Sequence, residues 1–142
     1  MQKLLFIVLL ALLFSFASCD NESNSLVGPT PSGAYSYTSF DSLGMAIVRG
    51  WFTMIHEDST KLIGNWSFQK IGTPQDIGPQ VGAGKLVGSQ IQDITSIALN
   101  PDVRDNNIHL RGTIKNNKYS GEWIYGTVIG ITNHGTFEAI KN

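Results

Sequence analysis

Cysteine is almost absent from this chain of 142 residues, which contains only Cys19. A single cysteine cannot form an intramolecular disulfide, so the fold has no disulfide framework. Charged residues are also few, at 15% of the chain, and no block of lysine or arginine occurs. Nucleic acids are bound through such basic blocks, so we expect no nucleic-acid partner.

Long apolar runs are missing except at residues 4–14. This run is too short for a membrane-spanning helix, which needs roughly 20 apolar residues. Lys3 precedes it as a positive start, and small residues follow it as far as Cys19. These are the three parts of an export signal, so we expect residues 1–18 to be a cleaved signal peptide.

The residues around the expected cleavage site form a recognisable motif. Phe16-Ala17-Ser18-Cys19 resembles the lipobox of bacterial lipoproteins, in which an apolar residue and two small residues precede cysteine. The resemblance implies that the Cys19 thiol carries a diacylglycerol and that the new amine is acylated, with palmitate as a typical chain. Two or more acyl chains anchor a protein stably. The alternative is an ordinary signal cut after Ala17 or Ser18, which leaves a free thiol.

The lipobox resemblance also implies a location. We expect a protein of the bacterial cell envelope, lipid-anchored to a membrane, with the outer membrane favoured and the domain in the periplasm or at the cell surface. Residues 19–32 are polar, include two prolines and show no periodicity. Such a composition predicts a flexible tether. Residues 33–142 remain for one folded domain.

An apolar stripe of helical period is missing beyond residue 32, where period-2 alternation dominates. Alternation of this kind predicts β-strands. Asn116-Asn117 predicts a hairpin, because asparagine tolerates the positive φ of a type I′ turn. We expect eight strands, near residues 33–40, 44–56, 61–70, 83–90, 94–99, 107–114, 118–126 and 131–140.

A glycine recurs on the inward face of six predicted strands, two residues from a large apolar side chain. The six are Gly50, Gly64, Gly88, Gly112, Gly121 and Gly135. Glycine weakens a strand interior, so its repeated use needs a reason. In a small closed barrel the strands coil tightly, and aromatic rings fit the lumen only where neighbours contribute no side chain. The pattern predicts an all-β, eight-stranded antiparallel up-and-down barrel.

The Gly-x-Trp and Gly-x-Phe patterns at residues 64–66 and 135–137 resemble those of the calycin group, the lipocalins and avidin-like barrels. The resemblance implies a calycin-like barrel over residues 33–142. A membrane-spanning barrel would instead place apolar residues outward. We reject that alternative because the outward positions include Arg111, Lys115 and Glu122.

The lengths of the connections predict two unlike ends. Alternate connections of a meander lie at opposite ends of the barrel. The long connections 71–82 and 100–106 therefore share one end, and short turns close the other, where the tether and the C-terminus also lie. The end with the long connections should point away from the membrane.

The motifs of common enzymes are missing. No Gly-x-Ser-x-Gly elbow is present, and acylation of Cys19 would remove the one cysteine nucleophile. Residues 78–86 are not a phosphate loop, since Pro79 and Leu86 occupy two of its required positions. Residues 102–107 are rich in oxygen ligands but lack the order of an EF-hand loop. We expect a non-enzymatic protein without a cofactor.

Metal-binding clusters are also missing. His56 adjoins Glu57 and Asp58, but His109 or His134 would have to complete a site through space. The last two histidines fall on outward faces in the predicted strands. We expect exposed strand residues rather than zinc ligands at these positions.

Four aromatic residues are the one group of side chains whose positions relative to one another can be predicted from the strand order. Trp66 and Phe68 should face Trp123 and Tyr125 across the lumen, because their strands are third and seventh of eight. These four residues either fill the core or line a pocket for a small apolar ligand. Two hypotheses stay open: a barrel that binds a small apolar ligand, or a protein-binding or inhibitor/scaffold barrel with a filled interior, acting through the 71–82 and 100–106 loops.

Overall fold

The computed structural model describes residues 30–75, 77–103 and 105–142. The predicted signal peptide, Cys19 and most of the predicted tether lie outside the described residues. Within those ranges, no helix is long and apolar enough to cross a membrane. The strands are β1 (Gly33–Phe40), β2 (Ala46–His56), β3 (Lys61–Lys70), β4 (Gly82–Ile91), β5 (Ile94–Leu99), β6 (Asn106–Lys115), β7 (Lys118–Thr127) and β8 (Gly130–Lys141).

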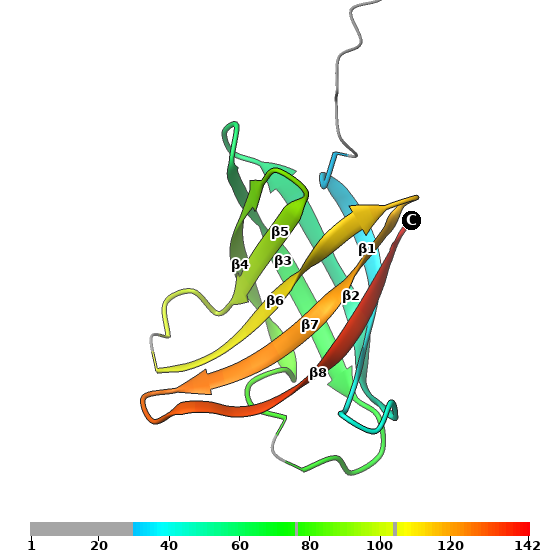
Figure 1. The fold of residues 1–142 in the computed structure, drawn as a ribbon, viewed down its shortest axis with the longest axis vertical. Coiled ribbons are helices and arrows are strands. Elements are labelled where there is room, and N and C mark those ends of the chain that lie inside the picture. The colour runs from blue at the N-terminus through cyan, green and yellow to red at the C-terminus, as the bar shows by residue number, and fades with distance from the viewer. Residues whose placement is uncertain (1–29, 76, 104) are drawn as a thin grey trace, which may run out of the picture.

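The eight strands form one closed antiparallel barrel (Figure 1). Each strand pairs with the next along the chain, and β8 closes the ring by pairing with β1, as in the pairing of Tyr37 with Ala139. Closure leaves no sheet edge along the paired length. The predicted fold class is confirmed, and the topology is that expected of a calycin-like barrel.

The two ends of the barrel differ as predicted. The short-turn end carries the connections 57–60, 92–93 and 116–117, and the long-loop end carries 41–45, 71–81, 100–105 and 128–129. Asn116 and Asn117 both have positive φ, at 51° and 62°, which confirms the hairpin turn. The described chain begins at the short-turn end, where the Lys141 ammonium donates a hydrogen bond to the Thr30 carbonyl at 3.3 Å.

The six recurring glycines lie where neighbouring strands approach most closely. A Cβ at any of them would lie 1.7 to 2.5 Å from a backbone carbonyl oxygen of another residue. At Gly64 that oxygen belongs to Thr53, and at Gly135 it belongs to Phe40. Glycine is therefore required at these positions mainly because a side chain would collide with the backbone of the neighbouring strand. Room for a ring is a second reason at Gly135, where the Trp123 indole also lies 2.6 Å from the added Cβ.

Candidate functional site

The four aromatic residues predicted as ligand contacts all belong to the barrel interior. Trp66, Phe68 and Trp123 are buried, and Tyr125 is partly buried against the core. The rings of Trp66 and Phe68 are in contact, with centroids 5.0 Å apart. Among the described residues, no ring contact joins this pair to Trp123 or Tyr125. The structure therefore does not bring the four together as one aromatic wall.

Other aromatic side chains of the interior contact Phe68 or one another. Tyr37 stacks on Phe68 at 4.1 Å between ring centroids and also contacts Phe52 and Phe137. Tyr119 contacts Phe137 at 4.7 Å. These contacts join rings from β1, β2, β3, β7 and β8 into one cluster across the lumen. Eight strands enclose little more than their own side chains, and here aromatic rings together with buried aliphatic side chains occupy that space.

Hydrogen bonds hold the polar atoms of this cluster. The Trp123 indole N–H donates to the Phe40 carbonyl at 2.7 Å. The Tyr119 hydroxyl lies 3.0 Å from the Thr95 carbonyl and 3.1 Å from the Leu110 carbonyl, to which it can donate. The Tyr35 hydroxyl donates to the Pro31 carbonyl at 2.8 Å, at the short-turn end. Buried polar groups need such partners, so the interior has the order of a core.

We expect the free energy of unfolding to fall as the pH rises above about 10, because three tyrosines are buried. Burial raises the pKa of Tyr35 from 10.0 to about 12, and burial also raises the pKa of Tyr37 and of Tyr119. The unfolded chain loses these protons near pH 10, whereas the folded chain keeps them. The Tyr35 contribution is therefore complete below pH 10 and is lost between pH 10 and about 12.

Urea unfolding between about pH 8 and about pH 11.5 measures this dependence. The variant Tyr35→Phe has no proton to lose at this position, so its stability should fall less steeply than that of the wild type. A wild-type midpoint that stays constant up to the highest pH would contradict the expectation.

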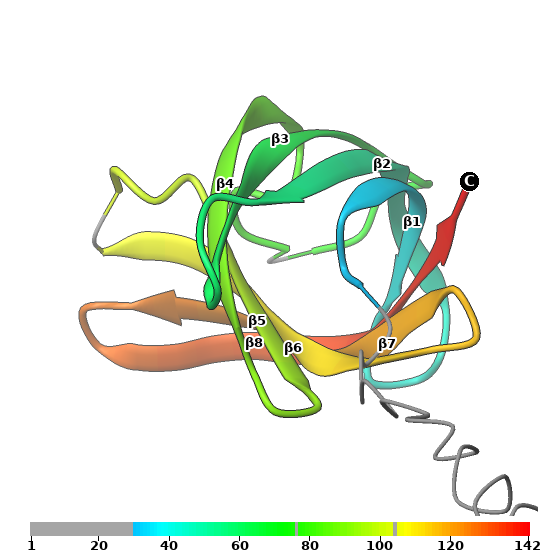
Figure 2. The same cartoon turned by 90° about the horizontal axis from the view of Figure 1, so that it is seen from above.

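The opening at the long-loop end is closed by the β3–β4 connection. Figure 2, which looks along the barrel, shows this connection crossing the far opening. Ile77 and Gln80 are buried, although both belong to a loop. Gly78, with φ of 61°, lies against the Tyr125 ring, where an added Cβ would be 2.6 Å from a ring carbon. Residues 77–80, here called the plug, thus pack into the mouth of the barrel.

Exposed apolar side chains lie on the connections at the long-loop end. In the β7–β8 hairpin, Val128 is 75% exposed and Ile129 is 87% exposed. Leu43 and Met45 are exposed in the β1–β2 connection, as is Val103 in the β5–β6 connection. At the short-turn end the three connections consist of polar residues, Glu57, Asp58, Ser59, Thr60, Gln92, Asp93, Asn116 and Asn117. The short-turn connections are thus polar, although exposed Ile91 and Ile94 flank one of them, whereas the long-loop connections carry exposed apolar side chains together with Asp102 and Asp105.

The apolar tips were not predicted as site residues, although the sequence contains a signal for them. Val128 and Ile129 form a two-residue hairpin connection between the paired Thr127 and Gly130. Asparagine, aspartate and glycine are the usual residues of such turns. Large β-branched residues such as Val128 and Ile129 are disfavoured at these turn positions. Residues that conflict with the local structure in this way often belong to functional sites.

A groove of about 480 Å³ lies outside the barrel, over β2, β3 and β4. Its floor includes Ile55, Ile63 and Val87, which are cross-strand neighbours on the outer face. Pro101 and Asp102 of the β5–β6 connection form part of its wall. One of the two loops predicted to contact a partner thus borders a mainly apolar hollow.

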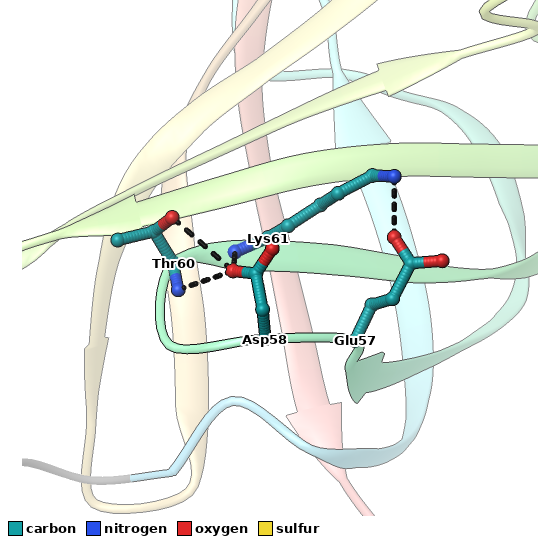
Figure 3. Close-up of polar contacts among 4 residues, drawn as sticks. All are labelled: Glu57, Asp58, Thr60 and Lys61. Carbon is teal, nitrogen blue, oxygen red and sulfur yellow. Dashed lines mark hydrogen bonds and ion pairs between the residues drawn. The ribbon is translucent and has the colours of Figure 1, made fainter.

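The polar residues first considered for a metal site hold a turn together (Figure 3). The Asp58 carboxylate accepts hydrogen bonds from the backbone N–H groups of Lys61 and Thr60, at 2.7 and 2.8 Å. These bonds lower the pKa of Asp58. Glu57 forms an ion pair with Lys61. In the part of the chain that the structure describes, no three His, Cys, Asp or Glu residues form a metal-binding group.

These features constitute the candidate site: a filled lumen, a plugged mouth, and a long-loop end with exposed apolar tips. No family model, curated protein or solved structure matches the chain in comparisons with known proteins.

Proposed function

We propose that this protein is a lipid-anchored, non-enzymatic binding protein of the bacterial envelope that contacts a protein partner through its long-loop end. The observation that carries the proposal is the apolar tip of the β7–β8 hairpin, where Val128 is 75% exposed and Ile129 is 87% exposed, with exposed Val103 on the neighbouring β5–β6 connection. Exposed apolar patches on soluble domains commonly mark interaction sites. The filled lumen supports the protein-binding hypothesis over carriage of an apolar ligand inside the barrel.

Two exposed carboxylates lie beside the apolar tip of the β7–β8 hairpin. Asp102 and Asp105 are exposed on either side of Val103, beside the β7–β8 hairpin that pairs with β6. Carboxylates are repelled by the negative surface potential of anionic lipids. They can pair with basic residues at the rim of a protein interface, around an apolar centre.

The lipid anchor gives the proposed surface its direction. The described chain starts at Thr30, on the short-turn end, so a lipid on Cys19 would hold that end toward the membrane. The long-loop end would then project away from the membrane, into the space where a partner could reach it.

We expect Cys19→Ala to abolish labelling of the full-length protein with palmitate in a bacterial host, because the thioether to the diacylglycerol cannot form. Gel autoradiography of the immunoprecipitated protein measures the label, and phase partitioning measures membrane attachment. Equal label in the wild type and the variant would refute the anchor.

We expect the paired substitution Val128→Asp and Ile129→Asp to reduce partner capture by at least about tenfold, because binding would bury unpaired carboxylates in an apolar interface. The measurement is mass spectrometry of proteins that co-purify with the tagged full-length chain after chemical cross-linking of the envelope. Because both side chains are largely exposed, the variant should unfold within about 0.5 kcal/mol of the wild type.

The matched control is Gln92→Asp with Asn116→Asp, which adds the same charge at the short-turn end. It should capture the wild-type set of proteins. If both variants or neither variant loses that set, the proposed surface is wrong.

A further inference from the structure

Trp51 differs from the other aromatic residues that the structure describes, because it alone is exposed, with 48% of its surface in solvent. It lies on the outer face of β2, directly opposite Ser36 of β1 and Ser67 of β3. Both neighbours have small side chains, so the indole remains open to solvent. Tryptophan in such a position is enriched among the residues that anchor binding partners.

The strands around Trp51 carry no carboxylate side chain. The consecutive strands β1, β2, β3 and β4 contain no aspartate or glutamate along their described residues. They contain four cationic side chains, those of Arg49, Lys61, Lys70 and Lys85. In the part of the chain that the structure describes, Lys61 is the one of these with a carboxylate partner, Glu57. This side of the barrel therefore has positive charge available for an anionic ligand.

Hydrogen-bonding side chains flank the indole on the same outer face. Arg49 and Gln69 form the outward cross-strand pair on one side of Trp51, and Thr53 and Asn65 form the pair on the other side. Same-face positions along a strand are roughly 7 Å apart. A ring stacked on the indole would thus have a guanidinium at one edge and amides at both. The guanidinium can bind a carboxylate through two parallel hydrogen bonds.

The groove over β2, β3 and β4 continues the surface around Trp51. Thr53 and Asn65 line the groove, and Lys85, directly opposite Asn65, lines it as well. Asp102 of the β5–β6 connection is the carboxylate on its wall. The groove adds length to the exposed indole, so the surface suits a chain of several rings.

We propose that this surface, formed by Arg49, Trp51, Asn65, Gln69 and Lys85 and here called the platform, binds an acidic oligosaccharide whose sugars carry carboxylates. The axial C–H bonds of a pyranose give the ring an apolar face, which packs on the indole. The carboxylate pairs with the guanidinium, and the ring hydroxyls bond to the two amides. A single-stranded nucleic acid fits less well, because it stacks on successive aromatic side chains and the platform offers one.

Two oligosaccharides with the same backbone provide matched probes. A hexasaccharide of β-1,4-linked glucuronate carries a carboxylate on every sugar, whereas cellohexaose is the same chain with neutral hydroxymethyl groups. Isothermal titration calorimetry of the full-length protein, in a detergent without a sugar headgroup, measures both dissociation constants. The glucuronate chain should bind at least about tenfold more tightly at low ionic strength, and this advantage should shrink in high salt, which screens exposed charges.

Substitutions on the platform separate stacking from charge. Trp51→Ala should weaken binding of the glucuronate chain at least about tenfold, because the stacking surface is lost. Arg49→Gln should weaken it about fivefold and leave cellohexaose binding unchanged. The matched control is Arg111→Gln, which removes the same charge from the outer face of β6, where Glu122 lies directly opposite. It should bind like the wild type.

All three substituted side chains are exposed, so the variants should stay folded, which circular dichroism checks. If Trp51→Ala did not fold, Arg49→Gln would still decide the question through its contrast between the two oligosaccharides.

Hexaglutamate serves as an acidic peptide and hexathymidylate as a nucleic acid in the same titration. The proposal would be overturned if either bound as tightly as the glucuronate chain, if the glucuronate chain did not bind, or if folded Trp51→Ala bound it unchanged. The tip variant of Val128 and Ile129 should bind the glucuronate chain like the wild type. Failure of the platform and failure of the partner surface can therefore be told apart.

Discussion

Replacing Gly64 by alanine is expected to lower the free energy of unfolding by about 3 kcal/mol or more, at the upper end of the cost of overpacking. The new Cβ would lie 1.7 Å from the Thr53 carbonyl oxygen, which belongs to the backbone of the neighbouring strand. A backbone atom cannot move aside as the end of a side chain can. The β2–β3 pairing must therefore shift, and the adjoining core contacts with it.

Gly126→Ala is the matched control for this substitution. Gly126 also lies in a strand, β7, but an added Cβ there meets no atom within 4 Å. The free energy of unfolding of the Gly126→Ala variant should therefore stay within about 0.5 kcal/mol of that of the wild type. Urea unfolding of both variants makes the comparison. Equal stability of the two variants would show that close approach of the strands is not why glycine occupies position 64.

Replacing Trp123 by alanine is expected to cost about 3–5 kcal/mol, the range for removing a large buried ring. Trp123 is fully buried, and its indole N–H donates to the Phe40 carbonyl at 2.7 Å. The substitution would leave both a cavity in the lumen and a carbonyl without this donor. Trp123→Phe should lose less, because it keeps most of the apolar volume.

Trp51→Ala is the control of equal size. Trp51 lies on the outer face of β2 and is 48% exposed, so its removal should cost about 1 kcal/mol or less. Thermal and urea unfolding measure both variants. If Trp123→Ala cost no more than Trp51→Ala, the interior would not be the packed core described above.

The sequence allowed the barrel to be predicted because the strands alternate with period 2 and the glycines keep one phase. The bounds of β1, β3 and β5 agree with the prediction, and the other strands differ by one or two residues at their ends. The Asn116-Asn117 turn was predictable because few residues tolerate positive φ at two successive positions. These features are local, so they can be recognised in a single chain.

The plug could not be predicted from the same patterns. Residues 71–81 have no periodicity, and the buried position of Gln80 depends on hydrogen bonds with Tyr37 and Ser39, about forty positions away. The ring contacts of the four aromatic residues could not be predicted for a similar reason, because they depend on residues far away in the sequence. All four side chains are turned toward the interior, but the alternation could not show that the Phe68 ring would stack on Tyr37 and contact no ring of β7.

The most direct test of the proposed long-loop surface is site-specific photo-crosslinking of the full-length protein in its native envelope. A benzophenone side chain replaces Ile129 at the long-loop end or, separately, Asn116 at the short-turn end. We predict a discrete protein adduct from position 129 and none from position 116. Adducts of equal yield from both positions, or an adduct from position 116 alone, would contradict the account.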